Sequence, residues 1–266
     1  MSKGVLVDMT KCFGCGACTV ACKLWNEKKY DEVNKPTVGE AAQLVDINWT
    51  VVSKHDVTDK SGQEAWRFAK KQCLHCVDPA CASSCLVGAL RRTPEGPVVY
   101  HPDLCVGCRY CMVACPFNIP KYEWDKSFPK VSKCQMCYSR VAAGEQPACI
   151  AVCPNQVMTF GDRDELIKEA HRRIEGNKAL YVNHVFGETE VGGTAWLYLS
   201  DQPFDALGFK TAVPQESLPA YTWQILSKLP AILLGWTAIL SGIYFFNKRR
   251  NAIAEGKQDN TGGPQA

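Results

Sequence analysis

The stretch CFGCGACTVAC, from Cys12 to Cys22, decides the fold because it places four cysteines close together in the chain. Its two glycines, Gly14 and Gly16, weaken any regular helix or strand, since glycine loses more conformational entropy on folding than other residues. Three more cysteine motifs follow, and together the four motifs contain all 16 cysteines of the 266-residue chain. No cysteine is left over, which indicates that the thiols share one chemical role.

The four motifs share a common spacing. Each contains a Cys-x2-Cys pair and ends with Cys-x3-Cys, and the third and fourth motifs are followed by proline. In chain order, motifs one to four are Cys12-x2-Cys15-x2-Cys18-x3-Cys22, Cys73-x2-Cys76-x4-Cys81-x3-Cys85, Cys105-x2-Cys108-x2-Cys111-x3-Cys115 and Cys134-x2-Cys137-x11-Cys149-x3-Cys153.

Disulfide bonds, zinc ions and iron–sulfur clusters are the alternatives for these thiols. Cysteine makes up about 6% of the chain, below the ~8–10% of short disulfide-stabilised proteins, and it occurs in clumps. The opening MSKGVLVDMTK lacks the apolar segment of a secretory signal peptide, so we do not expect an unfolded chain to enter an oxidising compartment. Zinc sites use two separated Cys-x2-Cys pairs, whereas motifs one and three match bacterial two-cluster ferredoxins, in which the fourth cysteine binds the other cluster.

The sixteen thiols therefore predict four [4Fe–4S] clusters whose fourth cysteines are exchanged between paired motifs. Motifs two and three lie close in sequence and are expected to pair, which leaves motif one to pair with motif four. We name each set after the motif that supplies three of its cysteines. Set one is Cys12, Cys15, Cys18 and Cys153; set two is Cys73, Cys76, Cys81 and Cys115; set three is Cys105, Cys108, Cys111 and Cys85; set four is Cys134, Cys137, Cys149 and Cys22.

The pairing predicts an α+β fold of two intertwined ferredoxin-like two-cluster units, with an insertion and one C-terminal transmembrane helix. The unit that holds motifs two and three is inserted between the two halves of the other unit. The expected divisions are 1–30 with 130–175 for motifs one and four, 31–70 for the insertion, 71–129 for motifs two and three, 176–224 for a connector, 225–247 for the transmembrane helix and 248–266 for a cytoplasmic tail.

Short strands and one longer helix are expected between the motifs. Asp162 and Glu165 have the spacing of a capping box, which predicts a helix that begins there and ends near Gly176. A turn at Pro94–Gly96 predicts a hairpin of residues 89–92 and 97–100. Further strands are expected at residues 4–9, 48–52, 65–69, 156–160 and 192–200.

The segment from Leu229 to Phe246 contains no charged residue. As a helix it spans about 27 Å, close to the ~30 Å thickness of the hydrocarbon core of a bilayer. A buried core helix is the alternative, but the segment is apolar all round. Lys248, Arg249 and Arg250 follow it, so the positive-inside rule places the C-terminus in the cytoplasm and the cysteine motifs on the periplasmic side of the inner membrane.

Other features exclude several functions. The net charge of +3 comes from interspersed acids and bases, which argues against nucleic-acid binding. Nucleotide-binding and hydrolase motifs are absent from the sequence, so we expect no catalytic site. His75, between two cysteines, is expected to be a hydrogen-bonded loop residue. Lysines near the motifs are expected to be exposed, although any lysine near a cluster would raise its potential; these are Lys70, Lys71, Lys121, Lys130 and Lys133.

Three quoted stretches carry a resemblance to a known family: KKQCLHCVDPACASSC, DLCVGCRYCMVACPFNIPKYEW and KCQMCYSR with PACIAVCPNQVMTFGDRDEL. They are similar to the four-cluster iron–sulfur subunits of membrane-bound molybdenum oxidoreductases and nickel–iron hydrogenases. EVGGTAWLYLSDQPF and the C-terminal apolar helix resemble the same proteins, the beta subunit of respiratory formate dehydrogenase among them. The similarity extends over about residues 4–250.

The resemblance implies a subunit that relays electrons and performs no catalysis itself. Its partners would be a catalytic subunit, either a molybdenum or tungsten formate dehydrogenase or a nickel–iron hydrogenase, and a membrane cytochrome b or quinone-reactive subunit in the lipid bilayer. Set one would face the catalytic partner, followed by sets four, three and two toward the membrane. A catalytic cluster and a structural zinc scaffold are the less favoured alternatives, since no cysteine is missing from any motif.

Two departures from the family bear on the partner. Leu86 follows Cys85 where the family usually has proline. The twin-arginine leader typical of the hydrogenase version is absent from this sequence, which favours the formate dehydrogenase interpretation. The export signal is then expected on the catalytic partner, with both subunits crossing the membrane as one assembled unit.

Overall fold

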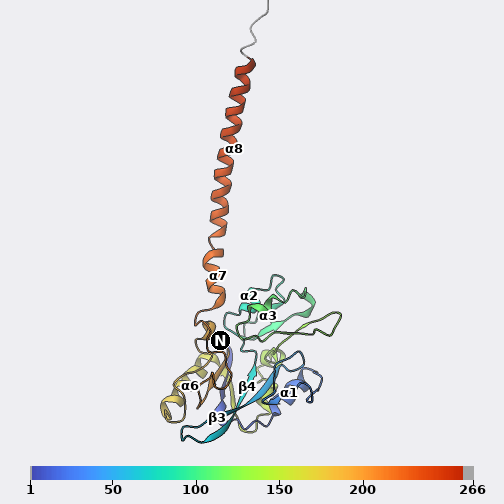
Figure 1. Ribbon diagram of the computed structural model, residues 1–266, viewed down its shortest axis with the longest axis vertical. Coiled ribbons are helices and arrows are strands. Elements are labelled where there is room, and N and C mark those ends of the chain that lie inside the picture. Colours follow the sequence, from blue (N-terminus) through green and yellow to red (C-terminus); the bar gives the residue numbers. More distant parts are fainter. Residues whose placement is uncertain (1, 260–266) are drawn as a thin grey trace, which may run out of the picture. The chain divides into compact units, whose positions relative to one another are not determined.

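The computed structural model of the chain describes residues 2–259 and divides into two units between Pro219 and Ala220. The first unit contains all the cysteine motifs and is a mixture of short strands and helices, as the predicted α+β class requires (Figure 1). The second unit is helical, with most of α7 (Leu218–Leu226) and all of α8 (Leu229–Asp259). The finer division of the first unit into ferredoxin-like parts stays a prediction.

A three-stranded sheet forms the centre of the first unit. β1 (Lys3–Asp8) lies between β10 (Trp196–Leu199), to which it runs parallel, and β9 (Met158–Asp162), to which it runs antiparallel. This sheet joins the N-terminus to segments that are distant in sequence. It therefore holds motif one next to the end of motif four.

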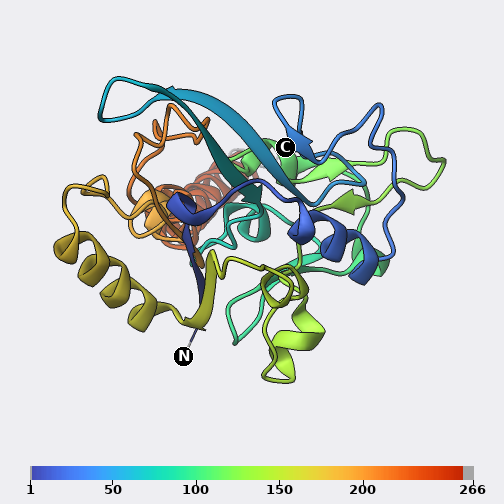
Figure 2. The same cartoon turned by 90° about the horizontal axis from the view of Figure 1, so that it is seen from below.

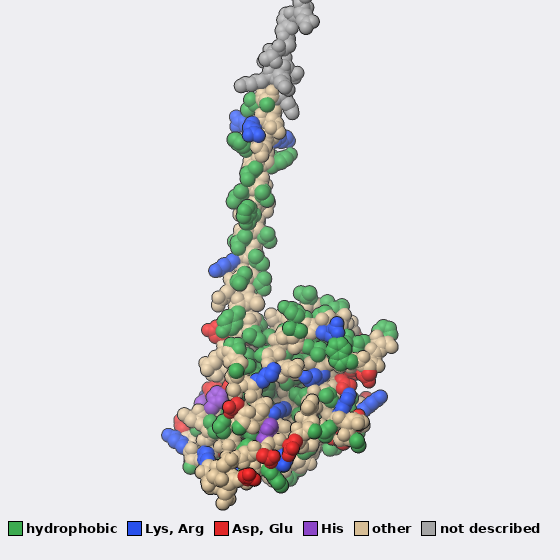
Figure 3. Space-filling view, in the orientation of Figure 1, with side chains coloured by type: hydrophobic (Ala, Val, Ile, Leu, Met, Phe, Trp, Pro, Cys, Tyr) green, Lys and Arg blue, Asp and Glu red, His purple; other side chains and the backbone are tan. Residues whose placement is uncertain are grey.

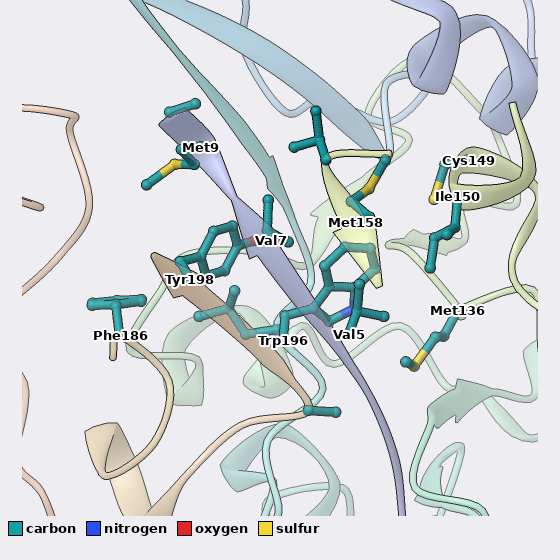
Figure 4. Packing of buried hydrophobic residues seen from close by; sticks show 14 of the residues in the cluster. Val5, Val7, Met9, Met136, Cys149, Ile150, Met158, Phe186, Trp196 and Tyr198 are labelled. Atoms are coloured by element: carbon teal, nitrogen blue, oxygen red, sulfur yellow. The ribbon is translucent and has the colours of Figure 1, made fainter. Parts of the chain in front are cut away.

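The two faces of this sheet serve different cores, because successive side chains of a strand point to opposite faces. Val5 and Val7 of β1 pack with Trp196 and Tyr198 of β10 in a cluster that also contains cysteines of motifs one and four (Figure 4). Leu6 points to the other face, where helix α6 covers the sheet. The cysteine motifs and α6 therefore lie on opposite faces.

Helix α6 (Arg163–Gly176) confirms the predicted helix, but the predicted capping box is wrong. Asp162 occupies the N-cap position without a side-chain hydrogen bond to the helix. Its carboxylate instead accepts a hydrogen bond from Lys3 Nζ at 2.8 Å, across the β1–β9 pair. The ion pair between neighbouring strands has replaced the local cap.

We expect Leu166→Ala to lower the free energy of unfolding by about 2–5 kcal/mol, because the substitution leaves a cavity beneath α6. Leu166, Ala170 and Ile174 are spaced by four residues and form the buried face of this helix. Urea unfolding followed by far-UV circular dichroism measures the change. Glu175→Ala, at an exposed position of α6, is the control; an equally small change in both variants would contradict the packing argument.

A long hairpin occupies the predicted insertion. β3 (Thr50–Thr58) pairs antiparallel with β4 (Glu64–Gln72), and β2 (Val38–Gly39) pairs parallel with β3 (Figure 2). Both strands of the hairpin are longer than predicted. The last residues of β4 lead directly into motif two, so this strand fixes where that motif begins.

Small elements complete the first unit and surround the cysteines. Two pairs of short strands are β5 (Leu90–Arg92) with β6 (Val98–Tyr100), the predicted hairpin, and β7 (Lys121–Tyr122) with β8 (Val131–Ser132). The short helices and 3-10 turns are η1 (Met9–Lys11), α1 (Ala17–Trp25), α2 (Ala80–Ser83), η2 (Pro102–Leu104), α3 (Tyr110–Ala114), α4 (Tyr138–Ala142), α5 (Ala148–Ala151) and η3 (Glu190–Gly192).

Helix α8 contains the predicted transmembrane segment. Within residues 2–259, one helical stretch, Leu218–Ala254, is long and apolar enough to span a membrane, with a mean hydropathy of 1.8. Its apolar side chains are exposed on all sides, and basic side chains gather near its C-terminal end (Figure 3). The predicted tail is helical up to Asp259, and residues 260–266 lie outside the described residues.

Candidate iron–sulfur centres

Set one lines a single cavity. Cys12, Cys15 and Cys18 of motif one surround it together with Cys153 of motif four. The loop closes tightly because Gly14 has a φ of +77° and because a Cβ at this position would lie 2.5 Å from the ring of Phe68. Glycine is therefore required for the loop to approach the cavity this closely.

Set three lines a second cavity of the same kind. Its walls include Cys105, Cys108 and Cys111 of motif three and Cys85 of motif two. Arg109, which precedes α3, adopts the left-handed conformation with a φ of +61°. The chain therefore turns sharply between the second and third cysteines, as it does at Gly16 in motif one.

The cysteines of set four are close together and largely buried. The pKa of Cys22 is raised to about 12 by burial and, to a smaller extent, by nearby Cys149 and Cys137. Burial also raises the pKa of Cys134, with further contributions from Cys22 and Cys149. Met136 and Cys137 both have positive φ angles, so this loop also uses left-handed backbone.

The cysteines of set two are also neighbours. Burial raises the pKa of Cys76 well above its usual value, and nearby Cys73, Cys115 and Cys81 contribute. Such thiols stay protonated at neutral pH in the protein alone, so the positive charge of a metal is needed to form the thiolates. Among residues 2–259, no group of three or more His, Cys, Asp or Glu side chains is arranged closely enough to hold a single metal ion.

Two contacts connect sets one, four and two. The pKa of Cys18 in set one is raised to about 12 by burial and also by nearby Cys149 in set four. Cys134 of set four and Cys73 of set two are both buried and pack with Ile119 in one cluster. Set four therefore lies between set one and set two.

Set three lies at the far end of this row. Cys81 of set two has Cys111 of set three among its neighbours. Of the sixteen cysteines, only Cys15 and Cys108 are exposed, and they belong to sets one and three. The row therefore runs through sets one, four, two and three, and each of its ends reaches the surface.

The predicted order of one, four, three and two is wrong in its second half. Sequence proximity correctly indicated that motifs two and three are neighbours, but it did not indicate which of them faces motif four. Cys73 directly follows β4 and packs beside Cys134. The loop that contains Cys108 instead faces solvent. The strand before motif two therefore decides the order.

Comparisons with known proteins identify the cofactor that these cysteine motifs bind in similar chains. Two family profiles, both described as a 4Fe-4S dicluster domain, match residues 11–89 and 64–163. The nitrate-inducible formate dehydrogenase iron–sulfur subunit of Escherichia coli K12 is 35% identical over 249 residues, which are 90% of this chain and 82% of that protein. The Hydrogenase-2 operon protein HybA of Escherichia coli O157:H7 is 33% identical and covers 90% and 84% of the two chains. A protein of Nitratidesulfovibrio vulgaris is 43% identical, over 97% of this chain and 70% of its own length.

The chain belongs to this family of iron–sulfur subunits. Members of the family transfer electrons and leave catalysis to another subunit. Two dicluster domains and 16 cysteines correspond to four [4Fe–4S] clusters. The family confirms the electron-transfer role and the cofactor type that were predicted from the motif spacing.

Hydrogen bonds to cysteine sulfur also fit this iron–sulfur subunit to hold such clusters. In each set, the cysteine contributed by the other motif accepts a hydrogen bond from a donor four residues further along the chain. The four donor and acceptor pairs are Val157 N to Cys153 Sγ at 3.4 Å, Asn26 Nδ2 to Cys22 Sγ at 3.6 Å, Ile119 N to Cys115 Sγ at 3.5 Å and Ala89 N to Cys85 Sγ at 3.2 Å. Hydrogen bonds to sulfur stabilise the thiolate and tune the potential of a cluster.

Asn26 was missed by the sequence analysis. Its side chain supplies the donor that the backbone supplies at the other three positions, because α1 continues past Cys22 and uses that backbone N–H within the helix. The signal was present in the sequence, since Asn26 occupies the same position relative to Cys22 as Ala89 does to Cys85.

The expectations for lysine are partly wrong. Lys70 and Lys133 are only 2% and 3% exposed, whereas Lys130 is exposed, and Lys71 and Lys121 are half-buried. Lysine is rarely buried without a partner, so a surface position was the expectation from its chemistry. The thiols that surround the two buried lysines come from distant motifs.

His75 is a buried, hydrogen-bonded loop residue, as predicted. Its Nδ1 accepts a hydrogen bond from the backbone N–H of Val98 at 2.9 Å, so the proton of the neutral ring lies on Nε2. Burial and then the charge of Lys133 lower the pKa of His75 well below its usual value. The imidazole is therefore neutral, and within the described residues its Nε2 has no hydrogen-bond partner.

Proposed function

We propose that each of the four sets holds one [4Fe–4S] cluster and that the subunit relays electrons along the row of sets one, four, two and three. The contacts between neighbouring sets carry this proposal. The intertwined arrangement of the two units has similar support, because Cys153 lines the cavity of set one and Cys85 lines that of set three.

The clusters supply one-electron redox centres when they are bound. The chain itself contributes burial, spacing and donors to sulfur. Exposed Cys15 and Cys108 mark the two ends at which electrons enter and leave, while the middle of the row is shielded by the central core. A catalytic role would require an incomplete set of cysteines, and each set has four.

The catalytic partner in this proposal is a formate dehydrogenase. Iron–sulfur subunits named for that enzyme are 35% identical in Escherichia coli and 32% identical in Haemophilus influenzae. A nickel–iron hydrogenase is the alternative, which the similarity to the Hydrogenase-2 operon protein supports.

Helix α8 is proposed to cross the inner membrane beside a cytochrome b or quinone-reactive subunit. Its apolar segment is followed, within the same helix, by Lys248, Arg249 and Arg250, and such cationic clusters remain on the cytoplasmic side. The cysteine motifs then lie on the periplasmic side. Set one would face the catalytic subunit and set three the membrane partner.

Purification of the affinity-tagged full-length chain from detergent-solubilised membranes tests the function. We expect about sixteen iron atoms and equal acid-labile sulfide per chain, and we expect formate to reduce the clusters in the purified complex. Reduction by hydrogen in place of formate would identify the hydrogenase alternative. Zinc in place of iron would contradict the relay itself.

A further inference from the structure

Lys70 on β4 is a charged side chain in the interior of the protein. It is 2% exposed, and its Nζ donates hydrogen bonds to Thr50 Oγ1 at 2.8 Å and Gln72 Oε1 at 2.7 Å. The same ammonium lies 4.5 Å from the centre of the Trp196 ring. The three groups that contact it carry no formal charge.

The ammonium of Lys70 has no carboxylate partner. Among the described residues, no Asp or Glu forms an ion pair with it, although a buried charge is costly unless it is compensated. Partially negative oxygens and an aromatic face compensate only part of that cost. The remaining compensation has to come from other negative groups nearby.

The nearby groups that can carry negative charge are cysteines of two different sets, because their thiols become thiolates when they bind metal. Lys70 lines the cavity of set one, and the thiols that act on it most strongly are those of Cys149, Cys18, Cys134 and Cys22. Burial acts to lower the pKa of Lys70, and the charge that these cysteines carry in their thiolate form acts to raise it. The ammonium of Lys70 therefore lies near cysteines of both set one and set four.

We propose that Lys70 is a fixed positive charge shared by sets one and four, which raises the reduction potentials of the clusters that they hold. This inference rests on the proposed assignment of ligands. Each cluster becomes more negative by one charge when it accepts one electron from the catalytic partner, and a cation at fixed distance stabilises that reduced state. No proton moves, because an ammonium group beside negatively charged clusters is favoured in its protonated form.

The surrounding hydrogen bonds hold the ammonium in place. Gln72 accepts from Lys70 through Oε1, and its Nε2 donates to the hydroxyl of Tyr198 at 2.6 Å. This second bond fixes the orientation of the amide, so its oxygen stays directed toward Lys70. Tyr198 is fully buried in the central core, which anchors the network to the sheet.

Lys133 provides an internal comparison. It is also buried, and its Nζ donates to the backbone oxygens of Val98 and Cys134, the latter at 2.9 Å. Its charge acts on Cys81 and Cys115, which belong to set two. Lys133 is therefore a second buried cation, and the thiols near it belong to set two.

Potentiometric titration followed by electron paramagnetic resonance tests the proposal on the full-length, iron-loaded protein in detergent with its co-purifying subunits. We expect Lys70→Met to lower the equilibrium constant for reduction of the set one or set four cluster about tenfold, which is about 59 mV for one electron. Lys133→Met should shift a different signal. Lys71→Met is the matched control, because its side chain points to the other face of β4 and donates to Gly208 O.

Gln72→Glu is a second test that retains the lysine. It places a carboxylate beside the ammonium and should lower the same potentials as Lys70→Met, so it decides the case if Lys70→Met fails to load iron. Unchanged potentials in an iron-loaded Lys70→Met protein, or an equal shift in Lys71→Met, would overturn the role of Lys70. A wild-type protein with fewer than four clusters would instead overturn the ligand assignment.

Discussion

Cys22→Ala is expected to remove the cluster of set four and to leave the cluster of set one in place. Cys22 lies in motif one, but its thiol is near Cys149 and Cys137 of motif four. The cavity of set one already contains a fourth thiol, that of Cys153. The substitution should therefore reduce the iron content by about four atoms per chain.

The loss interrupts the row at its second position. Set four lies between set one and set two, so formate-dependent reduction of quinone should fall nearly to background in Cys22→Ala. Val20→Ala, on the same helix at an exposed position, is the control and should retain all four clusters. Iron and sulfide analysis and paramagnetic resonance spectra measure the loss.

The spectra also show whether the fourth cysteine of a motif binds the cluster of the paired motif or the cluster of its own motif. Cys22→Ala should lose the same signal as Cys137→Ala, since both residues belong to set four. If Cys22→Ala instead loses the same signal as Cys15→Ala, each motif binds its own cluster and the exchange is wrong.

The sequence predicted the local elements better than it predicted how distant motifs meet. The strands at Val5 and Trp196 and the helix at Leu166 form where the sequence predicted them, because each depends on a short stretch of neighbouring residues. The contact between Cys73 and Cys134 depends on where β4 places the start of motif two, and that is set by strand pairing over a long hairpin. Spacing within a motif carries no information about that position.

The two buried lysines also show that local sequence does not indicate which distant segments will surround a residue. Lys70 follows an alternating pattern in β4, but alternation alone does not say what covers each face. Its compensation by the thiols of Cys18 and Cys149 appears only after folding. The expectation that lysine lies at the surface fails at this proposed functional site. A charge is retained in the core there for its effect on neighbouring groups.

An epitope tag fused after Ala266 is expected to be protected from protease in intact spheroplasts and digested after the cells are permeabilised. In the proposed orientation, the positive charges at Lys248, Arg249 and Arg250 hold this end of α8 in the cytoplasm. A tag inserted at Gly62, in the exposed turn between β3 and β4, is the control on the cysteine side and should be digested in intact spheroplasts. The expected difference between the two tags is all or none.

This orientation constrains how the subunit is assembled. Clusters are built in a reducing cytoplasm, and unloaded thiolates would be oxidised outside it. In the proposed orientation, the cysteine unit would fold and take up iron before it crosses the membrane, and the export signal would lie on the catalytic partner. Deleting that signal should leave the subunit iron-loaded but protect the Gly62 tag. Digestion of the Ala266 tag in intact spheroplasts would reverse the orientation and remove the need for export.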